Sequence, residues 1–141
     1  MRQGLLELFY LSLGSNVGDR AANLRAAIER LAEAGVPKAV SSLYETEPVD
    51  FREQPWFLNC VVALETDKSP RALLERVLAI EEELGRRRTR DKGPRIVDID
   101  ILLAGDRIIT ESGLKIPHPA MQERRFVLEP LAEIAAEAVH P

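Results

Sequence analysis

The chain has 141 residues, of which 45% are hydrophobic, and its formal net charge is −4. A chain of this length supports one hydrophobic core, so we expect a single domain over residues 1–141. The acidic balance argues against a surface built to neutralise nucleic acid, and the sequence shows neither a secretory signal nor a membrane-spanning run. We therefore expect a soluble cytoplasmic protein without nucleic-acid or membrane partners, either a monomer or a weak homo-oligomer.

The hydrophobic pattern at the start of the chain predicts a strand followed by a helix. Residues 8–13 are typical of a short buried strand, and the turn-rich segment after them leads into a helix over 20–34. Asn16 and Asp19 are both candidates for the helix N-cap. Gly35 stands where a left-handed C-terminal cap is expected.

The rest of the chain continues with further strands and helices. We predict strands over 40–46 and 57–65, a helix from Pro70 to Gly85, a strand through Asp98, a short strand at 108–109, and a helix over 125–138 that Pro130 starts or kinks. This order is typical of a ferredoxin-like α+β fold: a βαββαβ core with a largely antiparallel sheet packed by helices, and an extra C-terminal helical segment. Such a fold leaves the function open.

The only cysteine, Cys60, excludes an intrachain disulfide and metal sites built from cysteine clusters. It lies within the apolar run 57–64, where a small buried side chain is expected and a nucleophile is not. We assign it no chemistry.

Two carboxylates, Asp98 and Asp100, interrupt an apolar strand. Successive side chains of a strand point to opposite faces, so these two share one face while Val97, Ile99 and Ile101 fill the other. Like charges this close repel unless a cation lies between them, and magnesium held by carboxylates and substrate phosphates would remove the repulsion. The alternative is an amphipathic edge strand with a solvated acidic face.

The segment before this strand is strongly basic although the protein is acidic. Its six cationic residues within ten positions are Arg86, Arg87, Arg88, Arg90, Lys92 and Arg95. Such a patch suits a small polyanion such as a nucleotide triphosphate, and the alternative is a solvated helix end. The chain has no P-loop and no protein-kinase motif set, so a phosphate-binding enzyme here needs another design.

Four motifs occur along nearly the whole length of the chain. They are Leu13-Gly14-Ser15-Asn16, Gln54-Pro55-Trp56-Phe57-Leu58-Asn59, Gly93-Pro94-Arg95 with Asp98-Ile99-Asp100, and Pro117-His118-Pro119 with Arg124 and Phe126. In these motifs and their order the chain resembles the 6-hydroxymethyl-7,8-dihydropterin pyrophosphokinases of folate biosynthesis. The resemblance implies transfer of a pyrophosphoryl group from ATP to the hydroxymethyl oxygen of 6-hydroxymethyl-7,8-dihydropterin, with release of AMP.

The resemblance also implies which residues act in catalysis. Asp98 and Asp100 would hold two Mg²⁺ ions that bridge the triphosphate and the attacking hydroxyl. The spacing of the carboxylates accounts for one ion, and the second rests on the resemblance alone. Arg86 and Arg95 match the catalytic arginines that flank a mobile loop and engage the phosphates when it closes.

The binding residues follow from the same resemblance. The positions that match ATP contacts are Glu81, Arg88, Ile101, His118 and Arg124. The positions that match the pterin pocket are Thr46, Val49, Phe57, Asn59 and Phe126. A flat polar heterocycle needs aromatic faces above and below it and amide-like partners at its edge, which fits the second set.

Several of these residues have a plain structural alternative. The two phenylalanines can be core residues, His118 can pack between prolines without a ligand, and Glu81 can be solvated or salt-bridged. Asn59 is more telling, because an amide within an apolar strand is disfavoured unless its donors and acceptor are used. The alternative function, from a different class, is a non-catalytic ferredoxin-like module that binds a nucleotide or RNA through the arginine-rich segment.

Overall fold

The computed structural model describes residues 5–47, 55–85, 96–119 and 125–135, and the side chains of residues 125–127 fall outside this description. Within these ranges the chain forms seven strands and three helices. In chain order they are β1 (Glu7–Ser15), α1 (Arg20–Leu31), β2 (Val36–Val40), β3 (Tyr44–Thr46), β4 (Phe57–Thr66), α2 (Pro70–Glu83), β5 (Asp98–Ala104), β6 (Ile109–Glu111), β7 (Leu114–Ile116) and α3 (Arg125–Ile134).

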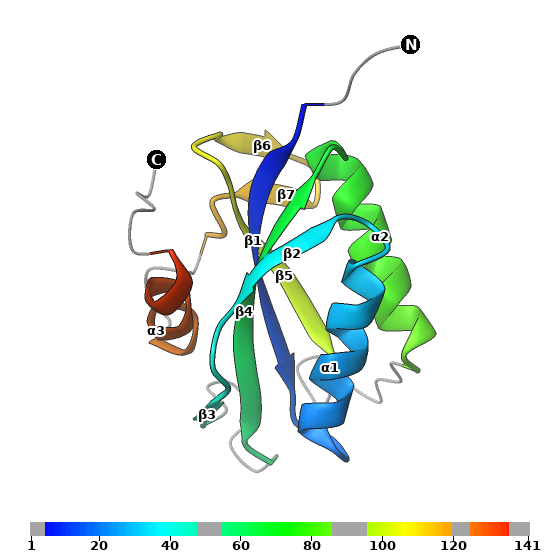
Figure 1. The fold of residues 1–141 in the computed structure, drawn as a ribbon, viewed down its shortest axis with the longest axis vertical. Coiled ribbons are helices and arrows are strands. Elements are labelled where there is room, and N and C mark those ends of the chain that lie inside the picture. The colour runs from blue at the N-terminus through cyan, green and yellow to red at the C-terminus, as the bar shows by residue number, and fades with distance from the viewer. Residues whose placement is uncertain (1–4, 48–54, 86–95, 120–124, 136–141) are drawn as a thin grey trace.

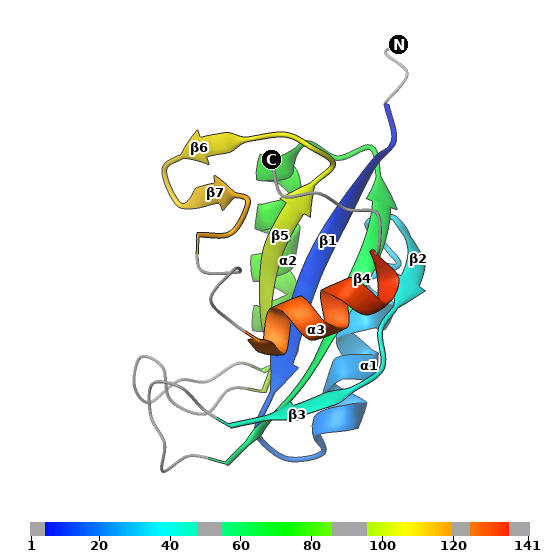
Figure 2. The same ribbon diagram turned by 90° about the vertical axis from the view of Figure 1, so that its left-hand side faces the viewer.

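The strands β2, β4, β1 and β5 lie side by side in that order, and β3 also pairs with β4. All of these pairings are antiparallel, and β6 and β7 form a separate hairpin. Helices α1 and α2 cover one face of the sheet, and α3 lies on the other, which we call the α3 face (Figure 1, Figure 2). The arrangement confirms the predicted ferredoxin-like α+β fold with an extra C-terminal helix.

The main core lies between the sheet and the helices α1 and α2. Leu11 and Leu13 of β1 are fully buried there, in one cluster with Leu24 of α1 and Ile80 of α2. The α3 face has a smaller apolar cluster, which consists of Val61, Leu102, Leu103 and Leu131. Among the described side chains, this cluster is smaller than the main core. No helix in the described ranges is long and apolar enough to cross a membrane.

Gly35 is not the left-handed cap that its position predicted. Helix α1 ends at Leu31, and its C-cap Ala32 has right-handed helical dihedrals. Gly35 instead allows a close approach of two backbones, because a Cβ there would collide with the carbonyl oxygen of Glu65 on β4. The prediction was right for Gly85, which follows α2 with a φ of +80°.

The strand predicted over 40–46 is wrong in its bounds, because β2 covers Val36–Val40 and only Tyr44–Thr46 forms β3. Ser41 explains why the two strands are separate. Its N–H donates to the carbonyl of Val61 at 2.9 Å, and its Oγ accepts the N–H of Val61 at 2.9 Å. The hydroxyl therefore takes the place of a backbone carbonyl in the ladder. Regular pairing with β4 resumes only at Tyr44.

Two predictions near the C-terminus also need correction. The short strand expected at 108–109 is part of a hairpin, because β6 pairs with β7 across a turn that contains Gly113 at a φ of +74°. The last helix ends at Ile134 and not at residue 138, and Pro130 lies inside it.

Candidate active site

Strand β5 divides its side chains between the two faces of the sheet as the sequence predicted. Ile99 and Ile101 are each 5% exposed and belong to the main core. Asp98 and Asp100 are half-buried on the α3 face, where Asp98 is the register partner of Gly14 on β1. The two carboxylates therefore lie on one face, two residues apart.

Glu81 of α2 is a buried carboxylate at the outer edge of β5. Its side chain is 5% exposed, and its Oε2 accepts the backbone N–H of Ile99 at 2.8 Å. Because β5 is an edge strand, the carboxylate takes the place that a further strand would occupy. The interpretation of Glu81 as a solvated side chain is therefore wrong. Glu81 fixes the backbone between the two aspartates, and its contact with ATP stays a prediction.

His118 lies beside the carboxylate pair. Its Nε2 is 3.8 Å from Oδ1 of Asp100, and its backbone N–H donates to the carbonyl of Leu102 at 3.0 Å. The segment after β7 thus returns to β5 and holds the imidazole next to Asp100. A histidine packed only between prolines would not make these contacts. The predicted contact of His118 with ATP remains a prediction.

A second polar group occupies the same face at strands β3 and β4. The side chain of Asn59 is 4% exposed, and its Nδ2 donates to Oγ1 of Thr46. Thr46 is the register partner of Phe57, whose half-buried ring belongs to neither apolar cluster. Asn59 therefore uses the donor of its amide, as the sequence predicted. Phe57 is not a plain core residue.

Gly14 of β1 lies between these two groups. It is the register partner of Asn59 on one side and of Asp98 on the other. A Cβ on Gly14 would lie 2.8 Å from Oδ1 of Asn59 and 3.4 Å from Cδ1 of Phe57. Gly14 was not among the predicted site residues, although a glycine inside a strand is itself a signal of close approach.

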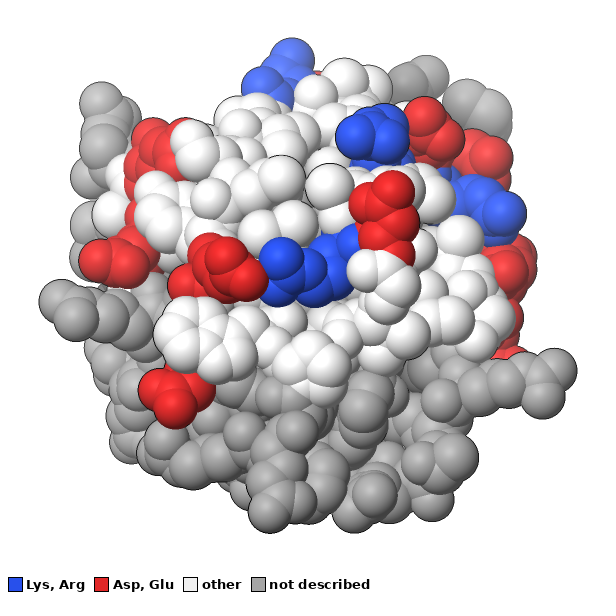
Figure 3. Space-filling view, turned by 90° about the horizontal axis from the view of Figure 1, so that it is seen from below, with Lys and Arg blue, Asp and Glu red and all other residues white. Residues whose placement is uncertain are grey.

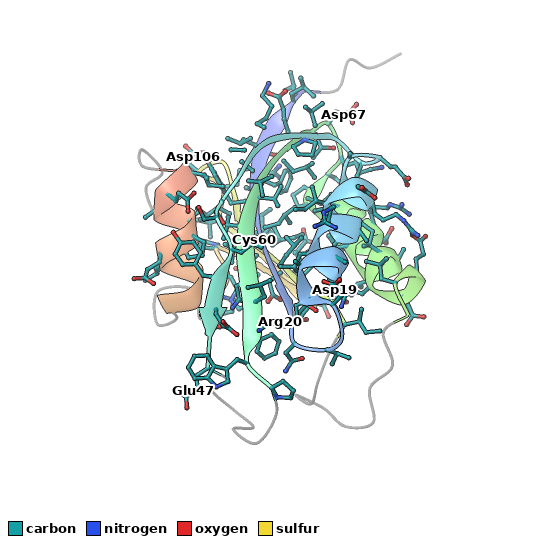
Figure 4. The ribbon with its side chains drawn as sticks, turned by 60° about the horizontal axis from the view of Figure 1, so that its bottom comes forward. Asp19, Arg20, Glu47, Cys60, Asp67 and Asp106 are labelled. Atoms are coloured by element: carbon teal, nitrogen blue, oxygen red, sulfur yellow. The ribbon has the colours of Figure 1, made fainter. Side chains whose placement is uncertain are left out.

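Residues on both sides of the range 48–54 are held by the loop after β1 and by the first residue of α1. Nδ2 of Asn16 donates to the carbonyl of Pro55 at 3.0 Å. Nη1 of Arg20 donates to Oε2 of Glu45 at 2.9 Å and to the carbonyl of Trp56 at 3.1 Å. Figure 4 shows Arg20 and Glu47 at the same end of the sheet, and in Figure 3, which views that end, basic and acidic side chains lie close together.

Of the two candidate caps for α1, one is confirmed and the other has a different role. Asp19 is the N-cap, because its carboxylate accepts the N–H of Ala22 at 3.0 Å. Asn16 is 1% exposed and bonds instead to the carbonyl of Pro55. Neither Asn16 nor Arg20 was predicted as a site residue, because their partners lie 25 to 39 residues away in sequence.

The remaining predicted residues fall into two groups. The side chain of Ile101 is in the core on the opposite face from the aspartates, so a contact with ATP on the α3 face would need its backbone. Phe126 lies in the first turn of α3, and its side chain is outside the described residues. Those entirely outside the described residues are Val49, Arg86, Arg88, Arg95 and Arg124.

The donor atoms of the site are carboxylate oxygens, which suit oxygen-seeking cations, and the single cysteine is chemically inert. Among the described residues no group of three or more His, Cys, Asp and Glu side chains forms a metal site. Asp98 and Asp100 offer two carboxylates. Proteins commonly bind magnesium with one or two carboxylates, while phosphates and water supply its other ligands. Burial raises the pKa of the Cys60 thiol to about 11, which agrees with the expectation that it has no chemical role.

Comparison with known proteins gives relatives over most of the chain. The 2-amino-4-hydroxy-6-hydroxymethyldihydropteridine pyrophosphokinase of Bacillus subtilis is 48% identical over 130 residues, which is 91% of this chain and 78% of that protein. The protein of the same name from Methylorubrum extorquens is 47% identical over 132 residues, or 92% of this chain and 84% of that protein. The folic acid synthesis protein fol1 of Pneumocystis carinii is 45% identical over 136 residues, and the chain spans only 18% of its length.

The fold is shared with solved structures of lower sequence identity. The wild-type HPPK-DHPS of Plasmodium falciparum, solved with pteroate, matches 99% of this chain and 41% of that chain with a TM-score of 0.76 and 19% identity. The sequence profile of the 7,8-dihydro-6-hydroxymethylpterin-pyrophosphokinase (HPPK) family matches residues 10–136. This match over most of the chain shows that the chain belongs to the 7,8-dihydro-6-hydroxymethylpterin-pyrophosphokinase family.

Proposed function

We propose that this chain carries out the reaction of its family on the α3 face of its sheet, transferring the pyrophosphoryl group of ATP to the hydroxymethyl oxygen of 6-hydroxymethyl-7,8-dihydropterin. The observation that carries the proposal is the position of Gly14 between Asn59 and Asp98. Adjacent strands are about 4.8 Å apart, so Asn59 and Asp98 are separated by roughly 10 Å of sheet. That spacing suits a bicyclic ring at one end and its hydroxymethyl arm meeting phosphate at the other.

The pterin would lie at the end of the site formed by β3 and β4. The ring of Phe57 supplies an aromatic face, and the amide of Asn59 and the hydroxyl of Thr46 supply hydrogen-bonding groups for the edge of the heterocycle. Asn59 and Thr46 are bonded to each other, so the polar edge is already oriented before a ligand arrives. Val49 and Phe126 complete this pocket by the family resemblance.

The triphosphate would lie at the end formed by β5 and the segment after β7. The donor set of Asp98 and Asp100 fits Mg²⁺, and two such ions, when bound, would neutralise the phosphates and bring the hydroxyl close to them. His118 stands beside Asp100, where it can bond to a phosphate oxygen. Arg86, Arg88, Arg95 and Arg124 are proposed to supply the remaining positive charge.

The reaction then needs positioning and charge stabilisation more than covalent chemistry from the protein. The hydroxymethyl oxygen forms a bond to the β-phosphorus, and the bond from that phosphorus to the oxygen that links it to the α-phosphate breaks. AMP leaves with that oxygen, and the hydroxyl proton is lost. Residues that hold the two substrates in line and face the developing charge therefore account for most of the rate.

The decisive experiment follows AMP and the pterin diphosphate by chromatography after the protein is incubated with ATP, Mg²⁺ and the hydroxymethyl-dihydropterin. We expect AMP and the pterin diphosphate in equal amounts, and only when ATP, Mg²⁺ and the hydroxymethyl-dihydropterin are all present. Asp98→Asn serves as the inactive control because it keeps the size of the side chain. Binding of ATP or RNA without magnesium, and without any AMP, would instead establish the non-catalytic module and overturn the proposal.

A further inference from the structure

The carboxylate of Glu133, near the end of α3, is held by donors from a distant part of the chain. The N–H of Ser42 lies 3.1 Å from Oε1 and 2.9 Å from Oε2, and the hydroxyl of Ser42 donates to Oε2 at 2.9 Å. The hydroxyl of Tyr44 donates to Oε1 at 2.8 Å. Both oxygens are used, by partners 89 to 91 residues away in sequence. We call Glu133, Ser42 and Tyr44 the Glu133 clamp.

The break between β2 and β3 makes this arrangement available. Ser41 turns toward β4 and exchanges two hydrogen bonds with Val61. The next residue, Ser42, lies between the two strands, and its N–H points to Glu133 rather than to a strand. The interruption of the edge strand thus provides a backbone donor for α3. Figure 2 shows α3 lying across the sheet beside the segment that joins β2 to β3.

The Glu133 carboxylate is ionised, which strengthens the hydrogen bonds that it accepts. Hydrogen bonds from Tyr44 and Ser42 hold the pKa of Glu133 below its usual range, so the group is ionised at neutral pH. The same bond, with burial and the nearby charges of Glu133 and Glu129, raises the pKa of Tyr44. Charge-assisted hydrogen bonds of this kind are about twice as strong as neutral ones and define a geometry.

The clamp joins the two elements that carry the predicted pterin residues. Tyr44 begins the three-residue strand β3 and Thr46 ends it, so alternation places both on one face. Tyr44 is also the register partner of Asn59. On the helix, Phe126 precedes Glu133 by seven residues, or about two turns. A shift of α3 against β3 would therefore change the position of Phe126 relative to Thr46 and Asn59.

We propose that Glu133 is a positioning residue for the pterin end of the site, where it holds α3 against β3 through Ser42 and Tyr44. The proposal rests on the proposed function, because it concerns how that site is kept in shape. Among the described side chains, Leu131, with Ile134 and Ala135 beside it, makes the apolar contact of α3 with the sheet, and the clamp adds a second fixed point. An exposed network of this kind contributes little to global stability, and its effect should appear in ligand binding.

The test compares Glu133→Gln and Tyr44→Phe with the wild type. Glutamine keeps the size of the side chain but presents N–H groups to donors, and phenylalanine removes one hydrogen bond and keeps the ring. Glu75→Gln makes the same chemical change at an exposed position of α2 and serves as the matched control. KM for the pterin, KM for ATP and kcat are measured for each, together with the melting temperature.

We expect Glu133→Gln to raise KM for the pterin about tenfold and Tyr44→Phe to raise it about threefold, while KM for ATP changes less than twofold. The double variant should be no worse than Glu133→Gln alone, because the two changes break the same contact. Fluorescence titration of the pterin in the presence of a non-hydrolysable ATP analogue should show the same loss without turnover. Glu75→Gln should behave as the wild type.

Two results would overturn the proposal. One is an unchanged KM for the pterin in both folded variants. The other is an equal rise in KM for both substrates, which would show a general disturbance of the fold. If Glu133→Gln does not fold, Tyr44→Phe decides alone. A folded wild type that forms no AMP overturns the proposed function, whereas an active wild type with variants like it overturns only the clamp.

Discussion

Gly14 and Asn59 face each other so closely across β1 and β4 that a Cβ on Gly14 would lie 2.8 Å from the Asn59 carboxamide oxygen. The glycine is not needed for its backbone freedom, because it is not among the described glycines with positive φ. Its hydrogen atom leaves room for an amide that is already bonded to Thr46. The residue type at position 14 is thus restricted by the neighbouring Asn59 side chain and not by the backbone conformation of β1.

Gly14→Ala should weaken pterin binding and leave ATP binding nearly unchanged. In a strand, alanine is ordinarily better than glycine by roughly 0.5–1 kcal/mol, so stability should fall little or rise. The new methyl group displaces the Asn59 carboxamide, and we expect the pterin dissociation constant to rise about tenfold, or about 1.4 kcal/mol. Isothermal titration with each ligand measures both constants.

A double substitution tests the physical cause of that loss. In an Asn59→Ala background the methyl group of Ala at position 14 no longer meets a carboxamide. Gly14→Ala should then add little to the loss caused by Asn59→Ala. Fully additive losses would mean that Gly14 acts through something other than Asn59.

The carboxylate pair gives the second prediction. Asp98→Asn and Asp100→Asn should each lower turnover by about 100-fold or more, because a metal bridging the phosphates loses a charged ligand. Without magnesium, each variant should melt at the same temperature as the wild type or above it, because a repulsion between like charges is removed. Melting curves with and without Mg²⁺, and AMP release, are the measurements. Near-normal magnesium-dependent turnover in both variants would contradict the metal assignment.

Local pattern was sufficient for the parts of the fold that depend on near neighbours. Alternation along β5 placed Ile99 and Ile101 in the core and the aspartates on the other face, and Gly85 ended α2 with positive φ as expected. The prediction of a continuous strand over residues 40–46 failed for a physical reason. A serine hydroxyl can replace a backbone carbonyl, as Ser41 does toward Val61, and hydropathy does not record such a substitution.

The site was predicted less completely because its order depends on contacts between distant segments. Glu81 could be placed on a helix by its spacing, but its bond to the Ile99 N–H depends on how α2 packs against β5. The same holds for Glu133, whose partners lie about ninety residues earlier. No periodicity over ten residues contains that information, and neither Glu133 nor its partners were predicted as site residues.

Glu81 gives the third prediction, which concerns stability. Glu81→Gln keeps an acceptor for the N–H of Ile99, so the free energy of unfolding should change little. Glu81→Leu leaves that donor buried without its acceptor and should cost about 1–3 kcal/mol. Urea denaturation of both variants gives the difference. An equal effect of the two substitutions would show that charge, and not the hydrogen bond, is what Glu81 contributes.

The last prediction concerns the pH dependence of the Glu133 clamp. The pKa of Glu133 is lowered in the folded state, so its contribution to stability is present above its unfolded pKa of about 4.3 and is lost as pH falls through the folded value. The pKa of Tyr44 is raised, so the contribution of its protonated hydroxyl is present below about pH 10 and is lost as pH rises through the folded value.

The difference in urea midpoint between wild type and Glu133→Gln should be small, because the clamp is exposed, constant between about pH 6 and 9, and should shrink toward both extremes. Tyr44→Phe separates the two ends of this window. Phenylalanine has no hydroxyl to ionise, so the clamp's contribution to the urea midpoint of this variant should no longer decline at high pH. The decline at low pH should persist, because Ser42 still donates to Glu133. A midpoint difference that stays constant from pH 3 to pH 11 would contradict the prediction, because neither the carboxylate nor the phenol would then be linked to folding through its ionisation.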